Sequence, residues 1–329
     1  MNGDPTFEDV LAAAERIRGH VHRTPVMTSS EIDAIAGAQL HFKCENLQKV
    51  GAFKARGATN AVLSLDDEAA GRGVATHSSG NHAAALAYAA GIRGVPAHVV
   101  MPSSAPPVKK AAVAGYGALI TECEPTLEAR ESTLDAVVER TGATFIHAYD
   151  NPMVIAGQGT ASLELITDVP DLDAVIAPVG GGGLMSGTAI AVSASRPDIT
   201  IWGSEPAGAD DAFRSLRDGT LYPSVAPKTI ADGLLTSLSD RTFRILSDRL
   251  ESIHRQRGDH RPRHASSLGT HEVGGRTVGS GTAGRGPRTP RTLRRSPRRA
   301  DHLRRQRRSR LPAVVNHPVV LLLMVVTSN

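Results

Sequence analysis

The sequence has few of the features that secreted or membrane proteins need. Its two cysteines, Cys44 and Cys123, lie far apart and without metal-ligand spacing, which argues against a disulfide framework and indicates a reducing compartment. The longest purely apolar run, Val319–Val326, is too short to span a bilayer. The charged N-terminal stretch lacks the apolar core of a signal peptide. We therefore expect a cytoplasmic protein with no membrane partner.

Aromatic residues are also scarce, at 3% of a chain that is 40% hydrophobic, whereas Ala, Gly and Val are plentiful. This composition suits parallel strands that are buried between helices and joined by tight glycine turns. Strand-like and helix-like stretches alternate from Phe7 to about His254, and the helix-like ones include Asn81–Gly91 and Gly157–Leu165. The predicted fold class is α/β, with open parallel sheets flanked by helices.

Lysine is rare as well, with six in the chain, and Lys54 stands in a glycine-bounded segment before a predicted helix. Taken alone, Lys54 is better explained as an ordinary surface residue. A lysine that acts as a nucleophile or base needs a lowered pKa, which burial or a neighbouring cation supplies. Lys54 is therefore a candidate catalytic residue only if other motifs support it.

Two further segments each lie between a predicted strand and a predicted helix. Ser78–His82 presents hydroxyl and backbone N–H groups that can bind an anion, although an ordinary helix cap has the same pattern. Gly180–Gly183 exposes four backbone amides, which suits a phosphate. A flexible turn is the alternative, but four glycines cost considerable chain entropy. The run lacks the G-x-G-x-x-G pattern, so a nicotinamide site is disfavoured.

The acidic segment Ser204–Asp211 follows a predicted strand and holds several carboxylates. Two carboxylates and a backbone carbonyl suit a hard divalent cation such as Mg²⁺. A solvated acidic loop explains the same residues.

Four motifs in this order resemble those of the fold-type II pyridoxal 5'-phosphate (PLP) enzymes, in the branch of the serine/threonine dehydratases and serine racemases. They are Gly51–Ala58 (GAFKARGA), Ser78–His82 (SSGNH), Gly180–Gly183 (GGGG) and Glu205–Ala212 (EPAGADDA). The resemblance implies two α/β domains similar to tryptophan synthase β, with PLP between them, and a homodimer. The large PLP-binding domain is expected at 1–72 plus 148–254, and the small domain at 73–147.

The resemblance also implies roles for single residues. Lys54 is expected to form the Schiff base with PLP and then transfer protons, and Ser79 to act as a second acid/base on the opposite face of the substrate. The implied PLP-binding residues are Phe53, Lys54, Asn81, Gly180, Gly181, Gly182, Gly183 and Leu184. The implied substrate-binding residues are Ser78, Ser79, Gly80, Asn81 and His82. The implied ligands of Mg²⁺, Mn²⁺ or Ca²⁺ are Glu205, the carbonyl of Ala209, and Asp211.

The activity implied by the resemblance is that of an ammonia-lyase, which converts L-threonine or L-serine to a 2-oxo acid and ammonia. A threo-3-hydroxyaspartate ammonia-lyase and a serine racemase are close alternatives. Ala52 stands where many family members have Ser, and this difference hints at hydroxyaspartate.

The segment 255–329 differs from the rest of the chain. It holds 17 arginines, no lysine and three acidic residues, so it carries +14 while the remainder carries −10. Up to Arg310 it has no helix or strand period, and the closing Ser-Gly-Gly-Asn strand of the family, whose Ser contacts the pyridine nitrogen of PLP, is missing. An inactive remnant with a tail that binds nucleic acid is one interpretation. The lack of lysine and of interleaved aromatic residues argues against it, so nucleic acid is not the expected partner.

A reading frame shifted by one base near His254 explains this tail better. In the shifted frame, the codons of Asp301–Val315 permit Ser-Gly-Gly-Asn-Val-Asp within the family's closing strand, and those of Gly281–Pro287 permit Glu-Pro-x-Gly-Ala-Val. We predict that sequencing the encoding DNA will show codons that spell these residues. Codons that cannot spell them would refute the frameshift. The chain as translated is expected to have low activity, to retain PLP poorly and to aggregate.

Overall fold

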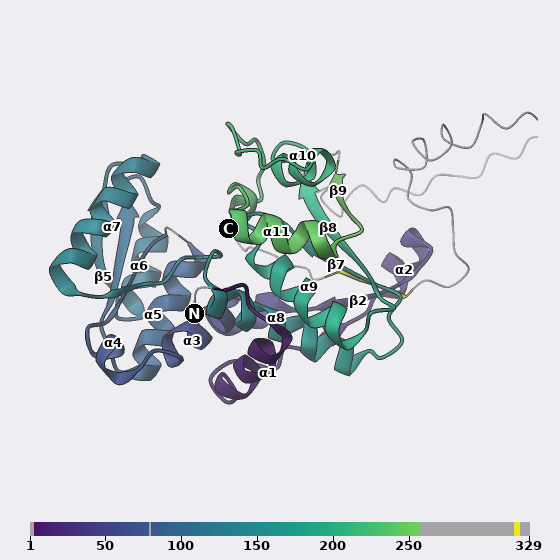
Figure 1. The fold of residues 1–329 in the computed structure, drawn as a ribbon, viewed down its shortest axis with the longest axis horizontal. Coiled ribbons are helices and arrows are strands. Elements are labelled where there is room, and N and C mark those ends of the chain that lie inside the picture. Colours follow the sequence, from purple (N-terminus) through teal and green to yellow (C-terminus); the bar gives the residue numbers. More distant parts are fainter. Residues whose placement is uncertain (1–2, 79, 257–318, 323–329) are drawn as a thin grey trace, which may run out of the picture. The chain divides into compact units, whose positions relative to one another are not determined.

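The structure, a computed structural model, describes residues 3–78, 80–256 and 319–322 (Figure 1). Two sheets carry the fold. The larger has six strands in the order β1-β2-β10-β7-β8-β9, and all neighbours are parallel except β1 and β2. Its strands are β1 Val26–Met27, β2 Gln39–Lys43, β7 Ala174–Pro178, β8 Thr200–Pro206, β9 Ser252–Gln256 and β10 Val319–Leu322.

The smaller sheet has four parallel strands in the order β5-β4-β3-β6. These strands are β3 Val74–His77, β4 Ala97–Pro102, β5 Leu119–Cys123 and β6 Thr144–Phe145. The chain runs outward from β3 through β4 to β5 and then returns to the other side of β3. The strand order therefore reverses between β3 and β6. Ligands of open parallel sheets bind beyond the carboxyl ends of strands at such a reversal.

Helices surround both sheets (Figure 1). The α-helices are α1 Phe7–Arg16, α2 Ser30–Ala36, α3 Lys54–Leu63, α4 Asp67–Gly71, α5 Asn81–Arg93, α6 Pro107–Gly115, α7 Leu127–Thr141, α8 Pro152–Asp168, α9 Gly183–Ser195, α10 Asp211–Asp218 and α11 Asp240–Arg249. Three 3-10 helices are η1 Glu45–Leu47, η2 Lys49–Gly51 and η3 Asp232–Leu234. No helix within the described residues is long and apolar enough to cross a membrane.

The buried helix α8 connects these elements, since it packs against α1, α3 and α9. It begins at Pro152, whose missing N–H costs nothing in the first turn, and the side chain of Asn151 caps the amides of Met153 and Val154. Its contact with α3 is backbone against backbone. A Cβ on Gly157 would lie 2.6 Å from Cα of Gly57. Only glycine at these two positions lets the helices approach so closely.

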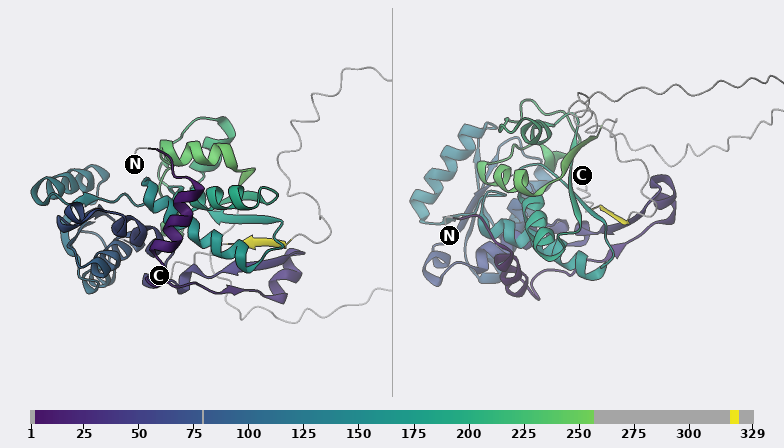
Figure 2. Two further views of the ribbon diagram at one scale, coloured as in Figure 1. Left: turned by 60° about the horizontal axis from the view of Figure 1, so that its bottom comes forward. Right: turned by 45° about the vertical axis from the view of Figure 1, so that its right-hand side comes forward.

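The predicted open parallel sheets flanked by helices are confirmed, whereas the domain boundaries stay a prediction. The tail differs from expectation in two places. β9 extends into it as far as Gln256, and Val319–Leu322 forms β10 between β2 and β7 (Figure 2). A strand of the tail thus occupies an inner position of the larger sheet. Residues 257–318 and 323–329 lie outside the described residues.

The central place of β10 leads to a test. Leu321 pairs with His41 of β2 and Val175 of β7. Proline in an inner strand removes a ladder hydrogen bond and leaves its acceptor unsatisfied, so we expect Leu321→Pro to lower the free energy of unfolding by about 1–3 kcal/mol. Amide hydrogen exchange in β2 and β7 should speed up, while Leu321→Val, which keeps the N–H, leaves it unchanged. Equal exchange in both variants would show that this segment does not pair with β2 and β7.

Candidate active site

Lys54 is the first residue of α3, and Phe53 precedes it as the N-cap. Its Nζ donates a hydrogen bond of 2.7 Å to the carbonyl of Ala148 and lies 5.2 Å from the ring centroid of Phe53. Burial lowers the pKa of Lys54 from 10.5 to about 8, because the charged form loses its hydration. Near neutral pH the fraction of free amine is therefore far larger than for an ordinary lysine, as a nucleophile or base requires.

The segment 146–149, which follows β6, contacts several of the predicted site residues. The carbonyl of Ile146 accepts a 3.0 Å hydrogen bond from Nε2 of His82, and the carbonyl of Ala148 accepts the one from Lys54. The Tyr149 ring packs so closely on Gly181 that no side chain fits there. Because β6 lies beside β3, this segment and the residues after β3 meet where the strand order reverses.

The sequence did not identify this segment as part of the site. Two of its contributions are backbone carbonyls, which leave no mark on residue identity, and the only available signal was its place after a strand. Its His147 is half-buried. Nδ1 of His147 accepts hydrogen bonds from the amides of Tyr149 and Asp150, at 3.3 and 2.8 Å, and burial lowers the pKa of His147 to about 4. The imidazole is therefore neutral at physiological pH.

The predicted substrate loop connects β3 to α5. The amide of Gly80 donates to the hydroxyl of Ser78 at 3.3 Å, and α5 begins at Asn81. His82 is 2% exposed, and burial together with nearby Lys54 lowers its pKa to about 3. Its Nδ1 has no hydrogen-bond partner among the described residues, so it is a free acceptor beside the lysine. Ser79 lies outside the described residues, and its acid/base role stays a prediction.

The glycine run joins β7 to the start of α9, and its positions exclude side chains. A Cβ would lie 2.8 Å from the carbonyl oxygen of Gly233 at Gly180, and 2.7 Å from Leu238 at Gly182. Gly182 also has φ +85°, which favours glycine. The first amides of α9 lack helical partners, and the helix dipole favours an anion beside them. Leu184, in that first turn, is buried.

These features fit PLP. The glycines and amides before α9 provide a cradle for its phosphate, and Lys54 provides an amine of lowered pKa. Ala148 and Tyr149, adjacent in the chain, contact Lys54 and Gly181 respectively, so the two parts of the site lie close together. The structure thus brings Lys54, His82 and the glycine run to one place. The individual binding roles of these residues stay predictions.

The predicted metal ligands lie between β8 and α10. Glu205 accepts hydrogen bonds from the amides of Ala212 and Phe213, at 3.1 and 2.8 Å. Burial, with Asp211 adding repulsion, raises the pKa of Glu205 to about 8. Oδ2 of the buried Asp211 makes no hydrogen bond among the described residues, and burial raises its pKa too. Ala209 is buried in the turn between them.

Two buried carboxylates in repulsion fit a divalent cation between them. Within the part of the chain that the structure describes, no group of three or more His, Cys, Asp or Glu side chains is placed to hold a metal ion. A cation here therefore needs the Ala209 carbonyl and water as additional ligands.

Comparisons with known proteins agree with this site. The model of the family "Pyridoxal-phosphate dependent enzyme" matches residues 17–257. The β-hydroxyaspartate dehydratase of Paracoccus denitrificans (strain Pd 1222) is 53% identical over 250 residues, which are 76% of this chain and 79% of that protein.

Two solved structures are similar in both sequence and fold. The serine racemase of Dictyostelium discoideum is 51% identical with a TM-score of 0.73, over 76% of this chain and 80% of that one. The threonine deaminase of T.th. is 46% identical with a TM-score of 0.72, over 76% and 81%. With the glycine cradle and the half-buried Lys54, these matches establish that the chain belongs to the pyridoxal-phosphate dependent enzyme family, in the fold-type II group.

Proposed function

We propose that this protein is a PLP-dependent ammonia-lyase that removes water and ammonia from L-threonine or L-serine. The observation that carries the proposal is the Lys54 amine, buried against the Ala148 carbonyl with its pKa lowered to about 8, close to a glycine cradle that excludes side chains. The relatives named above include a dehydratase and a deaminase, which supports the same chemistry. A cytoplasmic homodimer remains the predicted assembly.

In this proposal, Gly180–Gly183 and the first amides of α9 hold the phosphate of PLP, and Lys54 holds its other end. PLP supplies the electron sink that makes the substrate α-hydrogen acidic. Lys54, as the free amine, accepts the α-proton, and its ammonium then gives a proton to the departing β-hydroxyl, which leaves as water. The released enamine hydrolyses in water to the 2-oxo acid and ammonia.

The neutral histidines support this role for Lys54. His82 and His147 lie near enough to the lysine to interact electrostatically with it, and burial keeps both uncharged. Neither adds a fixed positive charge that would hold Lys54 permanently deprotonated, nor a negative charge that would hold it protonated. Lys54 can therefore both accept and return a proton within one turnover.

A second candidate substrate is threo-3-hydroxyaspartate. Ala52, fully buried beside Phe53, stands where many family members have Ser, and the relative from Paracoccus denitrificans is named for β-hydroxyaspartate. Racemisation of serine is a further candidate, supported by the likeness to the serine racemase of Dictyostelium discoideum. It requires a second acid/base, the role predicted for Ser79.

We also propose that Glu205, Asp211 and the carbonyl of Ala209 bind Mg²⁺ or a similar cation. The buried Asp211 oxygen without a hydrogen bond and the repulsion between the two carboxylates support this proposal. Asp211 also interacts electrostatically with Tyr149, whose pKa is raised by burial and by Asp150 and Asp211. A cation here would thus stabilise the side of the site that Tyr149 forms.

The activity proposal predicts keto-acid release from L-serine, L-threonine and threo-3-hydroxyaspartate in the presence of PLP and Mg²⁺. The chain with its frame restored after His254 should be the more active form, and its kcat/KM values will rank the three substrates. Lys54→Ala in that form should lower the rate at least about 100-fold, because a positioned acid/base contributes on the order of 10²–10⁴. Equal rates with and without Lys54, or no keto acid from any substrate, would rule out the proposal.

The metal proposal predicts a rise in melting temperature when Mg²⁺ is added to the full-length protein. At 100 times the dissociation constant, a bound cation stabilises the fold by about 2.7 kcal/mol. Asp211→Asn should abolish the rise. Asp210→Asn is the matched control, because Asp210 pairs with Arg214 and Arg255 and is outside the ligand set, so the rise should persist. A wild-type protein that does not respond to Mg²⁺, Mn²⁺ or Ca²⁺ would exclude the site.

A further inference from the structure

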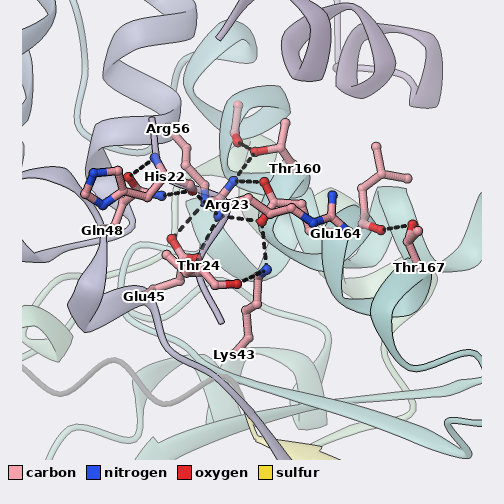
Figure 3. A network of polar contacts seen from close by, with 12 residues as sticks. His22, Arg23, Thr24, Lys43, Glu45, Gln48, Arg56, Thr160, Glu164 and Thr167 are labelled. Carbon is pink, nitrogen blue, oxygen red and sulfur yellow. Dashed lines mark hydrogen bonds and ion pairs between the residues drawn. The ribbon is translucent and has the colours of Figure 1, made fainter. Parts of the chain in front are cut away.

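Charged side chains from several elements form a buried cluster near the start of α3 (Figure 3). At its centre is Arg56, whose side chain is 0% exposed. Its Nε and Nη2 donate to the two oxygens of Glu45, each at 2.8 Å. Its Nη1 and Nη2 donate to the two oxygens of Glu164 at 2.7 and 2.9 Å. The planar guanidinium is therefore held by two carboxylates at once, a geometry that a lysine cannot reproduce.

The carboxylates are themselves held in place. Thr24 donates its hydroxyl to Glu45 at 2.6 Å, and the buried Lys43 lies 2.7 Å from Glu164. Lys43 and Arg56 balance the charges of Glu45 and Glu164. Asp168, which lies 3.7 Å from Lys43, is in turn paired with Arg23. Burial alone would raise the pKa of Glu164, but Arg56 and Lys43 outweigh it and keep the carboxylate ionised. In a buried cluster that is neutral as a whole, removal of any member leaves an unpaired charge and is strongly destabilising, which favours this one arrangement of the side chains.

The cluster joins three elements at the start of α3. Glu45 belongs to η1, which follows β2, and Glu164 belongs to α8. Next to Arg56, the amide of Gly57 donates to Oε1 of Gln158 in α8 at 3.2 Å. The chain before α8 carries Ala148, the partner of Lys54. The contacts of Arg56 and Gly57 with α8 thus fix the first turn of α3 relative to the carbonyl that Lys54 contacts.

We propose that Arg56 is a positioning residue for Lys54: by clamping the first turn of α3 to Glu45 and Glu164, it holds the Lys54 amine against the Ala148 carbonyl and away from water. Its importance for turnover rests on the proposed function, but the positioning itself is measurable without substrate. When the clamp is loosened, the amine gains water, and its pKa returns towards that of a hydrated lysine.

The test measures acetylation of Lys54 against pH by mass spectrometry, on the full-length protein after hydroxylamine has removed any PLP. Wild-type Lys54 should titrate near pH 8. Arg56→Lys should move the midpoint upward, towards the ordinary value of 10.5. A rise of one pH unit lowers the labelling rate at pH 8 about fivefold, since the free-amine fraction falls from about one half to about a tenth. The exposed Lys228 is the internal reference.

Arg93→Lys is the matched control. Arg93 donates to the carbonyl of Val62 at the far end of α3 and to Asp67, so its loss also weakens the anchoring of this helix. It should lower the melting temperature without moving the Lys54 midpoint. If Arg56→Lys lowers the melting temperature and leaves the midpoint unchanged, Arg56 is only structural and the proposal is overturned.

A second, milder variant keeps the proposal testable if Arg56→Lys does not fold. Thr160→Val removes a 3.2 Å acceptor of Nη1 of Arg56 and keeps the side-chain shape. It should raise the Lys54 midpoint by a smaller amount, and no rise in this variant would also contradict the proposal. The proposed function has a separate test. If Lys54 of the frame-restored protein titrates near pH 8 but the protein forms no keto acid, the proposed function is wrong and the positioning role of Arg56 is not affected.

Discussion

The close packing of α3 on α8 is the constraint on which the rest of the site depends. Gly57 and Gly157 bring the two backbones together, and a side chain at either position would force them apart. α3 begins with Lys54, and α8 begins just after the segment that carries Ala148 and Tyr149. The approach of these two helices therefore sets the distance between the lysine and its carbonyl partner. It also places the Tyr149 ring on Gly181.

Lys54 and Arg56 lie in the same turn of α3, yet their pKa values shift in opposite directions. Burial lowers the pKa of Lys54, because its only hydrogen-bond partner in the described residues is a neutral carbonyl. Burial would lower the pKa of Arg56 as well, but Glu45 and Glu164 outweigh it and hold the pKa above its ordinary value. The arginine stays charged and anchors the backbone in our proposal, while the lysine is the group proposed to exchange its proton. The difference between the two residues follows from their neighbours: Arg56 is paired with two carboxylates, whereas the Lys54 amine contacts a neutral carbonyl.

The sequence predicted those parts of the molecule that depend on local pattern. The alternation of strands and helices, the glycine run and the SSGNH segment were recognised because residue identity alone carries their signal. The start of α8 was placed five residues too late, at Gly157, although Asn151 and Pro152 form an ordinary cap and first turn. Ala148 was missed because its backbone carbonyl provides the contact. The partners of Arg56 were missed because Glu45 and Glu164 come together only through tertiary packing.

The strand between β2 and β7, here β10, can have two different roles, one structural and one in binding the cofactor. β2 and β7 lead, at their carboxyl ends, to the Lys54 loop and to the glycine run, and one strand between them sets their spacing at about 10 Å. Any extended segment can fill that backbone role, because ladder hydrogen bonds do not depend on side chains. The family resemblance assigns a second role to the residues after this strand, a side-chain contact with the cofactor. A substitute strand can thus preserve the sheet while leaving that contact unmade, which is why folding and activity need to be measured separately for this chain.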